Sequence, residues 1–219
     1  MVPAGTRTGF GDRARTLLRD VVMQATVEIV RTQGWARTRM GDIAAVAGIS
    51  KPTLYKYFGS REELAREYVD REVDQVLQTA RTVFERYPGD PERALTEGLQ
   101  HIVEDLSRNP LIRAVFTDDA VAASLLPLVT THGERLLKHA VDEIAAISSV
   151  ALPGALPEDI RAYSDTLVRL MISHAILPSP SVEDSVDSML RVALPLVRAA
   201  RENGNAAAPT PGGVDAAGG

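Results

Sequence analysis

Hydrophobic residues recur every three or four positions along most of the chain, which is the spacing of one face of an α-helix. The first such stripe consists of Leu18, Val22, Ala25 and Ile29. Asp12 is expected to cap the start of this helix, and Gly34 is expected to end it. The sequence shows no series of alternating strands rich in valine, isoleucine and threonine and bounded by turn pairs. The pattern therefore predicts an all-α protein.

Two short helices follow the first one. The segment "TRMGDIAAVA" at residues 38–47 predicts a helix with Thr38 as its N-cap, because a hydroxyl oxygen can accept from unpaired first-turn amides. Gly48 is expected to end this helix in a left-handed conformation. Ser50 is then expected to cap a third helix, "KPTLYKYF", at residues 51–58.

The rest of the chain predicts longer helices. Ser60 and Glu63 have the spacing of a capping box, which indicates the start of a helix that runs to about Tyr87. Pro195 falls inside the last predicted helix and is expected to bend or shorten its end. The helices expected after Tyr87 lie at about 91–108, 111–126, 130–150, 158–177 and 182–200.

The third short helix is apolar on one side only. At about 100° per residue, Leu54 and Phe58 fall together and define an inward face. Two short helices joined by a tight turn form a helix-turn-helix, whose second helix enters the major groove of DNA. The other faces carry side chains that can donate to bases and phosphates, namely Lys51, Thr53, Tyr55, Lys56 and Tyr57. A two-helix corner with surface lysines and half-buried tyrosines remains the alternative interpretation.

The distribution of charge favours the DNA-binding interpretation over the two-helix corner. Residues 1–66 carry 11 Lys and Arg against 6 Asp and Glu, a net charge of +5. Residues 67–219 carry 13 against 23, a net charge of −10. A basic N-terminal part on an acidic body indicates that only the N-terminal part meets a polyanion, although chance asymmetry is the alternative. The arginines of the N-terminal arm, Arg7, Arg13 and Arg15, add to the basic side.

Several kinds of site are excluded or disfavoured. The chain has no cysteine, so disulfides, thiolate nucleophiles and zinc–sulfur sites are impossible, and this composition is compatible with a reducing cytoplasm. No common catalytic or nucleotide-binding motif is present, and we expect no cofactor. His132 and His139 lie seven residues apart, a rise of about 10 Å on a helix, so we expect no metal site there. There is neither an apolar run of 18 residues nor a secretory leader, and we expect no contact with a membrane.

The segment "TRMGDIAAVAGISKPTLYKYFGSREEL" also resembles the helix-turn-helix of the TetR family of bacterial transcriptional regulators. The shared features are a threonine-led helix with "DIA", then "AGIS", then "TLYKYF" followed by "REEL". Lys56 occupies a variable position, which makes it a candidate for sequence choice. The resemblance implies that the residues at the DNA are Lys51, Pro52, Thr53, Tyr55, Lys56 and Tyr57, with Thr38, Ser50 and Arg61 on phosphates.

The expected organisation has four parts. These are a flexible arm at 1–12, a helix-turn-helix DNA-binding domain at 13–60, a helical ligand-binding and dimerisation domain at 61–202, and a disordered tail at 203–219. Because dimers read two half-sites about 34–36 Å apart, something must join two copies. The last two long helices are candidates for a four-helix interface, and the resemblance implies the same pairing.

Candidates for the body's two functions come from its apolar stripes. For the dimer interface they are Tyr163, Leu167, Leu170, Val186, Met189, Leu190, Ala193 and Val197, unless these stripes close the core of one chain. For an inducer pocket they are His101, Phe116, Leu126, His132, Met171 and His174, unless these are ordinary core residues.

The sequence thus predicts a cytoplasmic, ligand-responsive transcriptional regulator that is not an enzyme. Its expected partners are a palindromic double-stranded DNA operator, a small lipophilic inducer and a second copy of itself. Repression released by the inducer is the expected mode. A small helical enzyme and a helical adaptor that binds protein are the alternatives.

Overall fold

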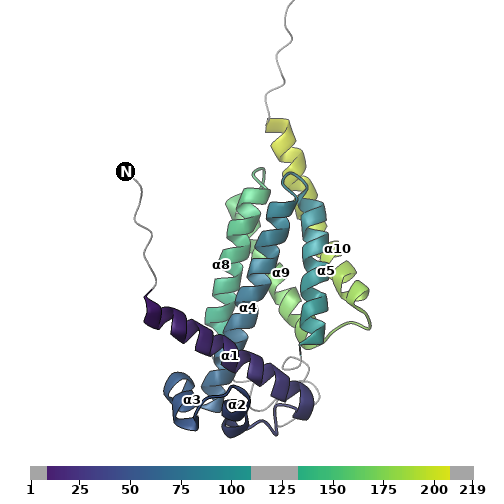
Figure 1. Cartoon of the computed structure of the whole chain (residues 1–219). Helices are drawn as coiled ribbons and strands as arrows, with labels where there is room; N and C mark the ends of the chain where they lie inside the picture. The colour runs from purple at the N-terminus through teal and green to yellow at the C-terminus, as the bar shows by residue number, and fades with distance from the viewer. Residues whose placement is uncertain (1–8, 110–132, 208–219) are drawn as a thin grey trace, which may run out of the picture. The chain divides into compact units, whose positions relative to one another are not determined.

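The computed structural model describes residues 9–109 and 133–207, and this part of the chain consists of helices joined by short turns (Figure 1). No strand occurs among these residues, which confirms the all-α prediction. The expected helix at 111–126 and the start of that at 130–150 lie outside the described residues. The helices are α1 (Phe10–Gln33), α2 (Met40–Val46), α3 (Lys51–Phe58), α4 (Arg61–Arg86), α5 (Pro91–Arg108), α8 (Gly133–Ala151), α9 (Pro157–Ile176) and α10 (Val182–Ala207).

The chain forms two compact units. Of the described residues, unit 1 holds 9–71 and 108–109, and unit 2 holds 72–107 and 133–207. The division falls within α4, after Arg71, whereas the sequence predicts a boundary before that helix. The reason is that the first turns of α4 carry buried side chains that belong to the core of unit 1: Leu64, Ala65 and Tyr68.

Unit 1 is built on α1, whose apolar stripe packs against the short helices (Figure 1). Val22, Ile43 and Leu54 are fully buried in this core. Trp35, which follows the glycine at the end of α1, is buried among them with 2 % of its surface exposed. Burying a large apolar side chain contributes about 1.5–3 kcal/mol, so these contacts hold the short helices, which would be marginal alone.

The caps of α3 and α4 are those that the sequence predicts. The Ser50 hydroxyl accepts from the Thr53 N–H at 3.2 Å. The Ser60 hydroxyl accepts from the Glu63 N–H at 3.1 Å, and the Glu63 carboxylate accepts from the Ser60 N–H at 2.8 Å. This reciprocal pair is a capping box.

The N-caps of α1 and α2 differ from the prediction, whereas Gly34 ends α1 as predicted. The N-cap of α1 is Gly9, so residues 10–12, predicted within the arm, form the first turn of the helix. The N-cap of α2 is Arg39. Thr38 is buried, and its hydroxyl donates to the Gly34 carbonyl at 2.8 Å instead of accepting from the amides of α2.

Unit 2 packs α9 against both α8 and α10. Its larger core cluster combines α5, α9 and α10 around the fully buried Met189. A smaller cluster around Val141 joins α8 to α4 and α9. The ion pair between Arg81 and Glu143 also links α4 to α8, but it is exposed and therefore contributes little stability.

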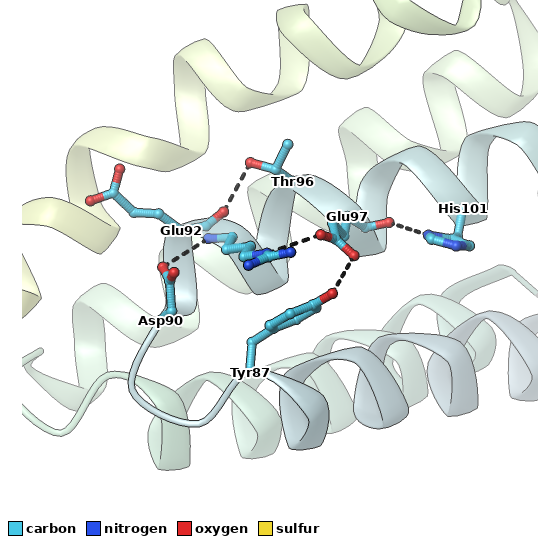
Figure 2. Close-up of polar contacts among 7 residues, drawn as sticks. Tyr87, Asp90, Glu92, Thr96, Glu97 and His101 are labelled. Atoms are coloured by element: carbon cyan, nitrogen blue, oxygen red, sulfur yellow. Dashed lines mark hydrogen bonds and ion pairs between the residues drawn. The ribbon is translucent and has the colours of Figure 1, made fainter.

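A polar cluster fixes the turn between α4 and α5 (Figure 2). The Tyr87 hydroxyl donates to Glu97 Oε2 at 2.7 Å, and Arg93 Nε donates to Glu97 Oε1 at 3.0 Å. The Arg93 guanidinium also lies 4.5 Å from the centre of the Tyr87 ring. The hydrogen bond from Tyr87, and then that from Arg93, lower the pKa of the Glu97 carboxyl from its ordinary value.

The end of α10 lies later in the chain than the sequence predicts. The helix continues to Ala207, so residues 203–207 are helical and do not belong to a disordered tail. Pro195 lies inside the helix, which runs on for a further 12 residues, so the expected shortening does not occur, and the expected bend stays a prediction. Residues 208–219, the rest of the predicted tail, lie outside the described residues.

Candidate nucleic-acid interface

Helix α3 divides its side chains between the core and the solvent. Leu54 and Phe58 are 0 % and 4 % exposed and anchor the helix from behind. Of the predicted DNA contacts on this helix, Lys51, Pro52, Tyr55 and Lys56 are exposed, and Thr53 and Tyr57 are partly exposed. The outward face of α3 therefore presents ammonium and phenol groups, which can donate to phosphates and base edges.

The Lys51 side chain is placed by its neighbour on α2. A Cβ added at Gly41 would lie 2.6 Å from Lys51 Cε and 2.9 Å from Nζ. The lysine therefore crosses α2 where that helix lacks a side chain. Nothing in the sequence distinguishes Gly41 from its neighbours, and only the contact between the two helices singles it out.

The three residues outside α3 that are predicted to contact phosphates differ in their exposure and in their side-chain partners. Ser50 is exposed, and its hydroxyl forms the cap of α3 and a 2.8 Å hydrogen bond with the Thr53 hydroxyl. Thr38 is 1 % exposed. The Arg61 guanidinium stacks on the Trp35 ring and donates to the Trp35 carbonyl. Contacts of all three with phosphate stay predictions.

Comparison with known proteins identifies this arrangement. Residues 22–68 match the family model described as bacterial regulatory proteins, tetR family, and residues 90–195 match that described as bacterial tetracyclin repressor, C-terminal domain. The chain belongs to the TetR family of transcriptional regulators. The first TetR match contains the helix-turn-helix of α2 and α3, and the second lies in the helical body.

Relatives agree over most of the chain. The HTH-type transcriptional regulator AlkX of Mycobacterium tuberculosis is 27 % identical over 189 residues, which cover 86 % of this chain and 89 % of AlkX. EthR of Mycobacterium tuberculosis is 27 % identical over 205 residues, which cover 87 % and 91 % of the two chains. The crystal structure of AlkX from a Dietzia strain, a TetR family repressor implicated in biodegradation of n-alkanes, matches with a TM-score of 0.70. That match has 28 % identity and covers 81 % of this chain and 96 % of that one.

The body of this TetR-family protein contains a cavity of about 160 Å³ in unit 2. Two of the predicted pocket residues, Met171 and His174, line it, together with Val103, Leu106 and the segment between α9 and α10. His101 does not line it: this histidine is exposed on α5, where its Nδ1 lies 2.7 Å from the Glu97 carbonyl oxygen. The other predicted pocket residues, Phe116, Leu126 and His132, lie outside the described residues.

The predicted dimer residues divide into core and surface. The structure places five of them in the core of one chain, which was the alternative interpretation: Leu167, Val186, Met189, Ala193 and Val197. A side chain enclosed in its own core has little surface left for a second copy. The three others are only partly buried: Tyr163, Leu170 and Leu190.

A hollow between α9 and α10 follows the edge of this core. It measures about 220 Å³ and is lined by Tyr163, Leu170, Val192 and Leu196 among others. Val192, which the sequence stripe did not include, is 53 % exposed. Burial raises the pKa of the Tyr163 phenol above its ordinary value.

Proposed function

We propose that this TetR-family regulator is a repressor that binds a palindromic operator as a homodimer and is released by a small lipophilic inducer. The observation that carries the proposal is the division of α3: Leu54 and Phe58 are buried, whereas Lys51, Tyr55 and Lys56 point to solvent. A helix held in this way can lie in the major groove with its polar side against the bases. Such a repressor acts in the cytoplasm, on the bacterial chromosome.

The charges of the helix-turn-helix support contact with phosphates. Among the described residues, neither Lys51 nor Lys56 forms an ion pair, so both ammonium groups are available to a polyanion. Each lysine that neutralises a phosphate releases counterions, which makes the affinity fall as salt rises. Tyr55, with 51 % of its surface exposed, can donate its hydroxyl to a phosphate oxygen.

The dimer is proposed to form over the hollow between α9 and α10. The exposed Val192 lies beside the partly buried Leu170 and Leu196, and an apolar patch of this kind fits a second copy of the chain. Two recognition helices joined in this way would read two half-sites.

The inducer is proposed to bind in the body. The 160 Å³ cavity combines apolar side chains with His174 and serines as polar anchors, a lining that suits a small lipophilic molecule with a polar group. The relation to AlkX, whose Dietzia form is implicated in n-alkane biodegradation, supports a lipophilic ligand. The inducer must bind more tightly to a form of the dimer whose two recognition helices do not match the spacing of the half-sites. A ligand with equal affinity for both forms would not change their populations.

Selection of bound sequences from a random DNA pool tests this proposal. We expect a palindrome with half-sites about one helical turn apart. The double variant Lys56→Ala, Tyr57→Ala should then lose at least about tenfold in affinity for the selected DNA. Lys138→Ala, which removes an exposed lysine of α8 in unit 2, is the control and should bind normally. If the double variant binds as tightly as the wild-type protein, α3 is not the recognition helix.

A further inference from the structure

The side chain of Arg61, the first residue of α4, packs against Trp35. Its guanidinium carbon lies 4.5 Å from the centre of the Trp35 ring, at a distance typical of a cation–π contact. Its Nη2 donates to the Trp35 carbonyl oxygen, and its Nε is buried. Two sides of the guanidinium are thus occupied within unit 1.

The carbonyl that Arg61 contacts belongs to the turn that enters the helix-turn-helix. The Trp35 oxygen also accepts from the Thr38 N–H at 3.0 Å, and the Thr38 hydroxyl closes the same turn on Gly34 at 2.8 Å. Arg61 itself stands just after the turn that leaves α3. The Arg61 side chain therefore connects the turn before α2 with the start of α4, directly after α3.

The local electrostatics agree with an internal role. Burial lowers the pKa of the Arg61 guanidinium from its ordinary value, and the Glu62 carboxylate acts in the opposite direction. A guanidinium can stack on a ring and donate to a carbonyl at the same time, because it is planar and has several donors in one plane. A lysine ammonium keeps the charge but lacks this geometry.

We propose that Arg61 is a positioning residue for DNA recognition, which fixes the α2–α3 pair against α1 through Trp35 instead of contacting a phosphate. The inference rests on the proposed binding of DNA through α3. Without the contact between Arg61 and Trp35, the orientation of α3 relative to the rest of unit 1 would no longer be fixed. The number of phosphates that the protein contacts would not change.

The test compares Arg61→Lys and Arg61→Ala with the wild-type protein on the selected DNA, at several salt concentrations. Helical content and melting temperature by circular dichroism are measured first, and affinities are compared well below the melting temperature. We expect both variants to lose about tenfold or more in affinity with the salt slope of the wild-type protein, since the slope counts neutralised phosphates. Lys56→Ala is the matched comparison, and its slope should be smaller by about 1.

Arg61→Lys alone is decisive if Arg61→Ala does not fold. The proposal is overturned if Arg61→Lys binds like the wild-type protein, because charge would then be enough. A slope lowered by about 1 in Arg61→Ala would likewise assign Arg61 to a phosphate. In both cases the wild-type protein and Lys56→Ala still report DNA binding, so the proposed function stands. Only the absence of DNA binding by the wild-type protein at every salt concentration would contradict both the proposed function and the proposed role of Arg61.

Discussion

Lys51 lies directly over Gly41, so that a methyl group on residue 41 would overlap the end of the lysine side chain, 2.6 Å from its Cε. Gly41 does not have positive φ, so its backbone would accept alanine. Glycine within a helix costs up to about 1 kcal/mol relative to alanine. The backbone therefore does not require glycine here, and a side chain at this position would displace the end of the lysine.

Gly41→Ala should consequently separate stability from function. We expect the free energy of unfolding to stay the same or to rise by up to about 1 kcal/mol. Affinity for the selected DNA should fall by roughly two- to tenfold, which corresponds to less than about 1.4 kcal/mol, because the ammonium is displaced. Denaturant unfolding and a DNA titration measure the two effects. Gly98→Ala on α5, whose Cβ would meet Val83 at an ordinary 3.9 Å, should leave DNA binding unchanged.

Gly59, between α3 and α4, should tolerate no side chain. Its φ of +66° is unfavourable for other residues, and a Cβ would lie 1.9 Å from the Glu63 carboxylate of the capping box. We expect Gly59→Ala to lower the free energy of unfolding by more than about 2 kcal/mol, the sum of backbone strain and a lost cap. Gly48 has the same φ but open space around it, so Gly48→Ala should cost only about 1–2 kcal/mol. Equal losses in the two variants would show that the capping box contributes nothing.

Two residues of α10 should separate the core from the proposed dimer surface. Met189 is fully buried, and Met189→Ala should cost about 2–5 kcal/mol of unfolding free energy. Val192 is exposed, and Val192→Glu should keep the fold but place a charge in the hollow, so that sedimentation detects monomers. Thr82→Glu, on the exposed side of α4, is the control for the added charge. A dimer that survives Val192→Glu would place the interface elsewhere.

Glu97 should make the stability of unit 2 sensitive to acid. Its pKa in the folded protein lies below the ordinary value of 4.5, so the folded state binds fewer protons than the unfolded state in this range. The stabilisation is present above pH 4.5 and is lost as the pH falls through the folded-state pKa. Glu97→Gln should therefore weaken the pH dependence of the melting temperature below pH 4.5. Glu85→Gln, which removes an exposed carboxylate of α4, should leave that dependence as it is in the wild-type protein.

Local signals account for most of what could be predicted. The caps at Ser50 and at Ser60 with Glu63 were predictable because both partners of each cap lie within four residues. The cap at Thr38 was assigned wrongly, because its hydroxyl had a second acceptor, the Gly34 carbonyl, which only the folded turn brings near. Likewise, the end of α10 lies beyond the predicted one, because residues 203–205 are Asn-Gly-Asn, and asparagine and glycine have low helix propensity.

Spacing along the chain was sufficient to determine an all-α protein and a third helix that turns Leu54 and Phe58 inward, since helical periodicity is a property of neighbouring residues. Contacts between distant residues decided the rest. Arg61 meets Trp35 across 26 positions, and Met189 is enclosed by helices that the sequence places far away. A hydrophobic stripe shows that a face is buried, but which surface buries it depends on how the whole chain packs.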